Sequence, residues 1–258
     1  MHPSYFKYRN FESPFSLPLL IDEVLYFTPP TEFNDPFDCQ CIVPYYYLPV
    51  NEIPKTLTRI FRENNVPTHL IADKVARELE LWPRTDEEKR DASHALAKKS
   101  ALRLGIFSLS VDGLNILMSS HYSNGHTGFT IGFNGELLVS SLPSEEWGKP
   151  TEVSYDDEYP AIDPTDQSPE SNEQWIKVFC SKARCWEYEK EFRMIGEAKY
   201  KLKLKPGTID QVILGINISS ENRTKIIEIL SSKEKRPKLY RSFPAIGTFK
   251  IELEEINY

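Results

Sequence analysis

Short runs of alternating apolar and polar residues recur along the 258-residue chain. Such alternation is typical of strands with one buried face, and Pro, Gly, Asn and Asp between the runs mark turns. In YFKYRN, at 5–10, Phe6 and Tyr8 are expected on one face of a strand, and Lys7 and Arg9 on the other. The predicted strands span residues 5–10, 24–28, 105–110, 127–133, 187–197, 200–205, 212–216 and 248–255.

The pattern changes to helical periodicity between residues 52 and 104. Helices are predicted there at 53–65, 69–81 and 85–104, and the third begins with a capping box made by Thr85 and Glu88. The alternating pattern returns directly afterwards, so residues 52–104 are interpreted as a helical insertion between strands. One further helix is predicted late in the chain, at 220–231.

These elements predict a single α+β domain over residues 1–258. Its sheets are expected to be mixed and mostly antiparallel, because no regular alternation of strands and helices indicates a doubly wound parallel sheet. Residues 143–175 are rich in Pro, Asp, Glu and Ser, and we expect them to form a long exposed loop.

Composition narrows the class of protein. Hydrophobic residues make up 40% and charged residues 27% of the chain, which is typical of a globular domain. The net charge of -7 disfavours a protein that coats a nucleic-acid backbone, while leaving room for a local basic patch. No apolar run reaches the ~20 residues of a membrane-spanning helix, so no membrane partner is expected. Four cysteines in this length favour a reducing compartment, and we expect a cytoplasmic location.

Several common motifs are absent. The sequence has no G-x-G-x-x-G, no G-x-x-x-x-G-K-[ST], no H-E-x-x-H and no G-x-S-x-G. The cysteines fall at 39, 41, 180 and 185, which are not the spacings of usual zinc sites. We therefore expect free, partly buried thiols, no bound metal and no resident cofactor.

The segment WEYEKEFR, at 186–193, is the most informative one. A continuous strand would place Glu187, Glu189 and Glu191 on one face, where mutual repulsion raises the pKa of one carboxyl. Such a face lines a functional site, or it is a solvated outer face paired with Arg184 and Arg193. The sequence leaves both interpretations open.

Two other segments carry candidate chemistry. Asn34 and Asp35 lie in the turn FNDPFD. Either the turn places them at the rim of a pocket, or their side chains only brace the turn itself. His121 and Tyr122 supply a proton donor and a stacking ring, or form a packed aromatic corner.

Two groups of basic residues lie on predicted strands. Lys7 and Arg9 suit a pyrophosphate, or they protect an edge strand by their charge. Lysines at 199, 201, 203 and 205 share one strand face, which favours a solvated edge over a nucleic-acid contact.

Taken together, the segments resemble a bacterial domain family of unknown function. The resemblance rests on FNDPFD at 33–38, S-H-Y at 120–122 and E-K-E-F-R at 189–193, and covers about residues 4–216. One departure is Ser119, at a position where that family often has Trp. The order of its motifs is similar to that of ADP-ribosyltransferase-like folds, which have a split sheet.

The resemblance implies an ADP-ribosyltransferase or NAD glycohydrolase, acting in bacterial conflict or phage defence. NAD would be a substrate, with Arg9, Tyr122 and Glu191 as the catalytic residues. Lys7, Tyr8, Asn34, Asp35, His121 and Glu189 would bind the substrate. The middle catalytic position is left open between Tyr122 and the Asn34–Asp35 turn.

Two other functions are kept beside this one. The first is a non-catalytic module that binds a ligand or a protein, and the second is a nucleic-acid-binding or nucleic-acid-processing protein. The sequence does not identify an acceptor, whether protein or nucleic acid.

Overall fold

Contacts within the chain group it into two compact units, which are described separately. The computed structural model describes residues 4–143, 148–163, 166 and 171–258. The first unit comprises residues 1–32, 103–153 and 185–258, and the second comprises 33–102 and 154–184. The two units are defined by how the chain packs, which does not show whether each of them folds independently. A single domain over the whole chain therefore stays a prediction.

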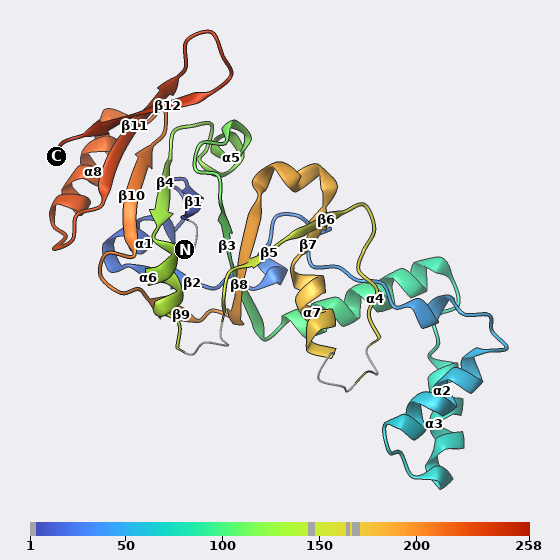
Figure 1. Cartoon of the computed structure of the whole chain (residues 1–258). Helices are drawn as coiled ribbons and strands as arrows, with labels where there is room; N and C mark the ends of the chain where they lie inside the picture. The colour runs from blue at the N-terminus through green and yellow to red at the C-terminus, as the bar shows by residue number, and fades with distance from the viewer. Residues whose placement is uncertain (1–3, 144–147, 164–165, 167–170) are drawn as a thin grey trace. The chain divides into compact units, whose positions relative to one another are not determined.

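The first unit is built on a sheet of eight strands in the order β12-β11-β10-β4-β1-β3-β8-β5 (Figure 1). Its strands are β1 (Tyr5–Arg9), β3 (Leu104–Ser110), β4 (Phe129–Phe133), β5 (Thr151–Glu152), β8 (Glu191–Glu197), β10 (Ile209–Leu214), β11 (Lys238–Pro244) and β12 (Ile251–Ile256). Only β10 and β11 pair in parallel among these described strands. The expected α+β class with a mixed, mostly antiparallel sheet is therefore confirmed.

The other elements of this unit surround the sheet. They are α1 (Ser16–Asp22), β2 (Val24–Tyr26), η1 (Pro30–Glu32), α5 (Ile116–Tyr122), α6 (Gly135–Ser140), η3 (Arg184–Glu189), β9 (Lys201–Lys203) and α8 (Ser220–Ser231). β2 and β9 form a separate two-stranded antiparallel sheet. α8 connects β10 to β11, and Figure 1 shows the three elements together at one end of the sheet.

One face of the large sheet forms the hydrophobic core. Phe107, Phe129, Ile131, Phe133 and Met194 point from the strands into it. Helices cover this face with buried leucines and isoleucines, namely Leu19 and Leu20 of α1, Leu138 of α6, and Ile226 and Leu230 of α8. The burial of Ile226 and Leu230 agrees with the inward face expected for the late helix.

The second unit contains most of the expected helical insertion. Its elements are η2 (Pro44–Tyr47), α2 (Ile53–Glu63), α3 (Thr68–Glu80), α4 (Asp86–Ala101), β6 (Ser154–Asp156), α7 (Ser171–Phe179) and β7 (Ser181–Ala183). At the start of α4, Glu88 N donates to Thr85 Oγ1 at 3.1 Å and Thr85 N donates to Glu88 Oε2 at 2.9 Å. This confirms the capping box read from the sequence.

Some predictions of elements are wrong. The strand expected over 187–197 starts only at Glu191, because residues 184–189 form the 3-10 helix η3. Glu187 and Glu189 therefore do not share a strand face with Glu191. The long loop expected over 143–175 contains β5, β6 and the beginning of α7, while its residues 144–147, 164–165 and 167–170 lie outside the described part of the chain.

The edge-strand interpretation of Lys7 and Arg9 is also wrong. β1 lies inside the sheet, hydrogen-bonded to β4 on one side and to β3 on the other. Its charged residues therefore do not protect an edge. In the described ranges, no helix combines the length and apolar composition that a bilayer crossing requires.

Replacing Phe107 by alanine tests the importance of the covered face. Phe107 is 1% exposed, so Phe107→Ala removes a buried ring and leaves a cavity, which costs about 3–5 kcal/mol of the free energy of unfolding. Phe249 is 100% exposed, and Phe249→Ala should change that free energy by less than about 0.5 kcal/mol. Urea denaturation of both variants measures the difference, and similar losses would contradict this assignment of the core.

Candidate functional site

The sheet carries several polar side chains on the face opposite the core. Phe6 of β1 pairs with Ser110 of β3, and Ser110 pairs with Glu191 of β8. Directly opposed residues of antiparallel strands point to the same side, so these side chains form one row across three strands. Arg193, two residues after Glu191, points to this side as well.

Glu191 and Arg193 form a buried ion pair on this face. Arg193 is 0% exposed and Glu191 is 4% exposed. Arg193 Nε donates to Glu191 Oε1 at 2.8 Å, and its Nη2 donates to Oε2 at 3.1 Å. This bidentate contact fixes both side chains, and each charge compensates the other away from water.

A second buried carboxylate, Glu189, lies at the end of η3. Tyr122, the last residue of α5, donates its hydroxyl hydrogen to Glu189 Oε1 at 2.6 Å. Glu189 is 2% exposed. Burial raises the pKa of Tyr122, and the negative charges of Glu189 and Glu191 raise it further, so the phenol keeps its proton at neutral pH.

Aromatic rings lie beside this tyrosine–glutamate pair. The His121 ring centroid is 6.3 Å from those of Trp186 and Tyr188, and the last two rings are 6.0 Å apart. His121 itself is exposed, while Trp186 and Tyr188 are partly exposed. The ring cluster of His121, Trp186 and Tyr188 therefore brings aromatic surface to solvent next to a buried carboxylate.

Asn115 connects the two short elements that carry the site. Its Oδ1 accepts from Met118 N at 3.1 Å and thereby caps α5, while its Nδ2 donates to the Tyr188 carbonyl of η3 at 2.8 Å. Its backbone N–H donates to the Tyr8 hydroxyl at 3.0 Å. A second brace comes from Ser110, whose hydroxyl donates to the Glu189 carbonyl at 2.6 Å.

Of the residues singled out in the sequence, this site brings together Tyr122, Glu189, Glu191 and His121, with Tyr8 as a support. It does not include Lys7 or Arg9. These two residues alternate with Phe6 and Tyr8 along β1, so they point to the core face of the sheet. The expected convergence of Arg9 with Tyr122 and Glu191 is therefore not found.

Both basic residues have local surroundings that differ from a pyrophosphate site. Lys7 Nζ donates to the Ser108 carbonyl at 2.6 Å and lies 4.9 Å from the centroid of the Phe107 ring. Arg9 Nε is buried and has no hydrogen-bond partner within the described ranges. Burial lowers the pKa of Arg9 to about 10.

Asn34 and Asp35 belong to the second unit and are described on their own. Asp35 Oδ1 accepts from Phe37 N at 2.9 Å, and the Asp35 carbonyl accepts from Asp38 N at 3.2 Å. Asn34 is exposed. The structure therefore contains the braced turn that was the simpler interpretation of this segment.

Three residues that complete the site were not predicted from the sequence. Trp186, Tyr188 and Asn115 were not among the candidates, although Asn115 directly precedes the apolar run ILM and so has the position of a helix cap. No disulfide bond joins the four cysteines, all of which lie in the described ranges, and Cys185 is the exposed one. Within the described ranges, no group of three His, Cys, Asp or Glu side chains is arranged to hold a metal ion.

The double role of Asn115 generates a stability prediction. Asn115→Ala loses the helix cap and the bond to Tyr188, each of which contributes about 1 kcal/mol, so unfolding should become easier by about 2 kcal/mol. Asn134 is a matched control, because its Oδ1 caps α6 through Leu137 N at 3.0 Å. Asn134→Ala should therefore cost about 1 kcal/mol in the same urea denaturation. Equal losses would show that the Asn115–Tyr188 bond contributes nothing measurable.

Comparison with known proteins found a similarity for one segment of the chain. No curated protein and no solved structure gave a significant match. Residues 118–194 match a family model described as "Protein of unknown function (DUF2971)". The matched segment starts in α5 and ends in β8, and so includes Tyr122, Glu189 and the Glu191–Arg193 pair. The chain therefore contains a DUF2971 domain of unknown function at these residues.

Proposed function

We propose that the chain binds NAD and breaks the bond between its nicotinamide and ribose, as an ADP-ribosyltransferase or NAD glycohydrolase does. The observation that carries this proposal is the 2.6 Å hydrogen bond from Tyr122 to the buried Glu189, beside the partly exposed ring cluster. Sugar-directed chemistry needs a carboxylate held in place, and a flat heterocyclic base needs rings to stack on.

The reaction develops positive charge on the ribose as nicotinamide leaves. A carboxylate near the ribose stabilises that oxocarbenium-like state, and Glu189 is assigned this role. Water or another acceptor hydroxyl then forms the new bond to the ribose carbon, and a carboxylate accepts its proton. Because Tyr122 keeps its own proton, it acts as a fixed donor that orients Glu189.

Glu191 has a different part in this proposal from the one that the family resemblance implied. Nε and Nη2 of Arg193 both donate to its carboxylate. Glu191 therefore supports the site electrostatically and compensates the charge of the buried guanidinium. Lys7 and Arg9 have no part, because they point to the core face. The relationship to ADP-ribosyltransferase-like folds, with their split sheet, remains part of the proposal and rests on the order of the sequence motifs.

Nicotinamide release tests the proposal. The wild-type chain should release nicotinamide from NAD, and Glu189→Gln should lower the rate at least ~100-fold, because the charge that stabilises the transition state is lost. Tyr122→Phe should lower it ~10-fold or more, since only the orienting hydrogen bond is removed. Glu252 is exposed on β12, and Glu252→Gln serves as the control with unchanged turnover. No release by the wild type, or equal release by Glu189→Gln, would contradict the proposal.

A second candidate is a non-catalytic module that uses the same surface to bind a ligand. The observation in its favour is that Glu191 is enclosed in an ion pair with Arg193 and does not face Arg9. This function predicts NAD binding or binding of another ring-bearing ligand without release of nicotinamide.

Calorimetric titration separates the two functions. For a binding module, NAD should bind to the wild type and to Glu189→Gln with dissociation constants within about threefold, while Trp186→Ala should weaken binding about tenfold through loss of stacking. Turnover that depends on Glu189 would exclude the binding module.

A further inference from the structure

Two basic segments far apart in the sequence meet in the first unit. Residues 199–207 and 233–238 together contain eight lysines and arginines and one glutamate, in a chain whose net charge is -7. All of these basic residues are exposed except Lys233, whose side chain is 10% exposed. Such a local excess of positive charge in an acidic protein is the pattern of an anion-binding surface.

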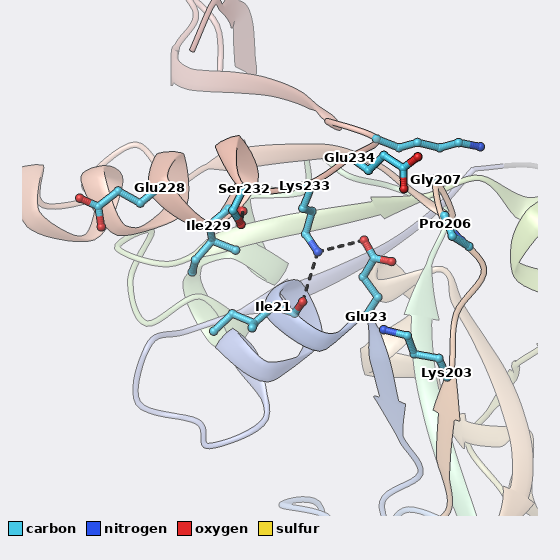
Figure 2. A pocket seen from close by; sticks show the side chains of 11 residues that line it. Ile21, Glu23, Lys203, Pro206, Gly207, Glu228, Ile229, Ser232, Lys233 and Glu234 are labelled. Atoms are coloured by element: carbon cyan, nitrogen blue, oxygen red, sulfur yellow. Dashed lines mark hydrogen bonds and ion pairs between the residues drawn. The ribbon is translucent and has the colours of Figure 1, made fainter.

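A cavity lies where the two segments meet. Its volume is about 580 Å³, and it lies between the end of α1, the strand β9 and the end of α8. Figure 2 shows Lys203, Lys233 and Glu23 at its wall, together with Gly207 and Glu234. Lys235 lines it as well. The cavity is therefore bordered by three lysines from the two basic segments.

Lys203 and Lys233 are held in place by the end of α1. Lys233 Nζ donates to Glu23 Oε1 at 2.9 Å and to the Ile21 carbonyl at 3.4 Å, as the dashed lines in Figure 2 indicate. Lys203 Nζ donates to the Asp22 carbonyl. An ammonium has three N–H donors, so both lysines keep capacity for a further acceptor.

Gly207 makes room for the third lysine. It follows Pro206 in a turn closed by Thr208 N, which donates to the Lys205 carbonyl at 3.1 Å, and its φ of +85° favours glycine. A Cβ at this position would lie 3.0 Å from Lys235 Cδ and 3.7 Å from its Nζ. The ammonium of Lys235 therefore lies across the turn, and it has no ion-pair partner within the described ranges.

Three carboxylates, Glu23, Glu228 and Glu234, line the cavity and equal its three lysines in number. Glu23 is already paired with Lys233, which leaves Glu228 and Glu234 against Lys203 and Lys235. Lys201 and Lys205 add two exposed cations next to Lys203 on the same segment. The lining alone is therefore balanced, and the excess of positive charge comes from Lys201 and Lys205 beside it.

We propose that this cavity binds a phosphate group, with Lys203, Lys233 and Lys235 as the donors. Phosphate oxygens accept several charge-assisted hydrogen bonds at once, which suits a cavity lined by lysines that keep unused donors. A solvated edge strand would explain the lysines of β9, but it does not explain the cavity or the placement of Lys235 over Gly207. This site lies apart from Glu189, and the inference does not depend on the proposed function.

The phosphate could belong to a nucleic-acid chain or to a small phosphorylated molecule, and two probes distinguish these sources. A fluorescein-labelled single-stranded 20-mer is titrated with the full chain by anisotropy, at several salt concentrations. ADP-ribose is titrated separately by calorimetry, and inorganic phosphate serves as the competitor in both cases.

The test variant is the double substitution Lys203→Gln and Lys235→Gln. It should weaken binding of the recognised probe about tenfold or more, because two charge-assisted hydrogen bonds are lost. For the 20-mer, the slope of log affinity against log salt should fall in magnitude by about 1.4. The control is Lys149→Gln with Lys250→Gln, which removes two exposed lysines elsewhere and should leave affinity and slope unchanged. Thermal unfolding of both double variants checks that the fold is retained.

Binding of the 20-mer with competition by phosphate supports a nucleic-acid source. Binding of ADP-ribose alone, with the same competition, supports a small phosphorylated ligand. The proposal is overturned if neither probe binds, or if the Lys203 and Lys235 double variant binds as the wild type does.

Discussion

A guanidinium that is completely removed from water must have its charge compensated inside the protein, and the arrangement around Arg193 depends on this constraint. Desolvation of an isolated cation costs far more than a folded domain can supply. Glu191 provides the counter-charge from two positions earlier on the same strand, which requires both side chains to point to one face of β8. A shift of one residue in the pairing of β8 would turn this pair into the hydrophobic core, so the ion pair and the core specify the same register.

This polar face gives the site its character. The core face of the sheet is covered by helices, whereas the opposite face carries serines, carboxylates and a buried cation under the short helix α5. The buried charges are thus located where a small element, braced by Asn115, brings Tyr122 to Glu189. Perturbed ionisable groups gathered in this way are common at functional sites, and they also occur in structural ion-pair networks.

Local signals predicted part of this structure. The helix at 220–231 and the capping box of α4 depend on neighbouring residues, and both are confirmed. The strand predicted through WEYEKEFR was wrong in its first half, because apolar and polar residues alternate both in the 3-10 helix η3 and in the strand β8. The backbone changes direction at Lys190, whose φ is +45°, between η3 and β8. The alternation of apolar and polar residues continues across this position, so the sequence does not show where the strand begins. Likewise, the place of β1 inside the sheet is set by pairing with distant strands, so its charges wrongly indicated an edge. Residue type was enough to single out Tyr122, Glu189 and Glu191. Arg9 was assigned to the wrong place, because the pairing of β1 with β3 and β4 decides which face of the sheet its side chain takes.

The position of β1 also has a consequence for how the chain reaches this fold. β1 precedes all other strands of this sheet in the sequence and lies between β4 and β3, and Phe6 pairs with Ser110, which comes 104 residues later. Until β3 and β4 have been made, both edges of β1 lack their partners, while most of the second unit is synthesised in between. Pairing over such a separation is slow, because a long loop must close before any contact is gained. The nascent chain therefore carries an unpaired aromatic segment until β3 and β4 have been synthesised.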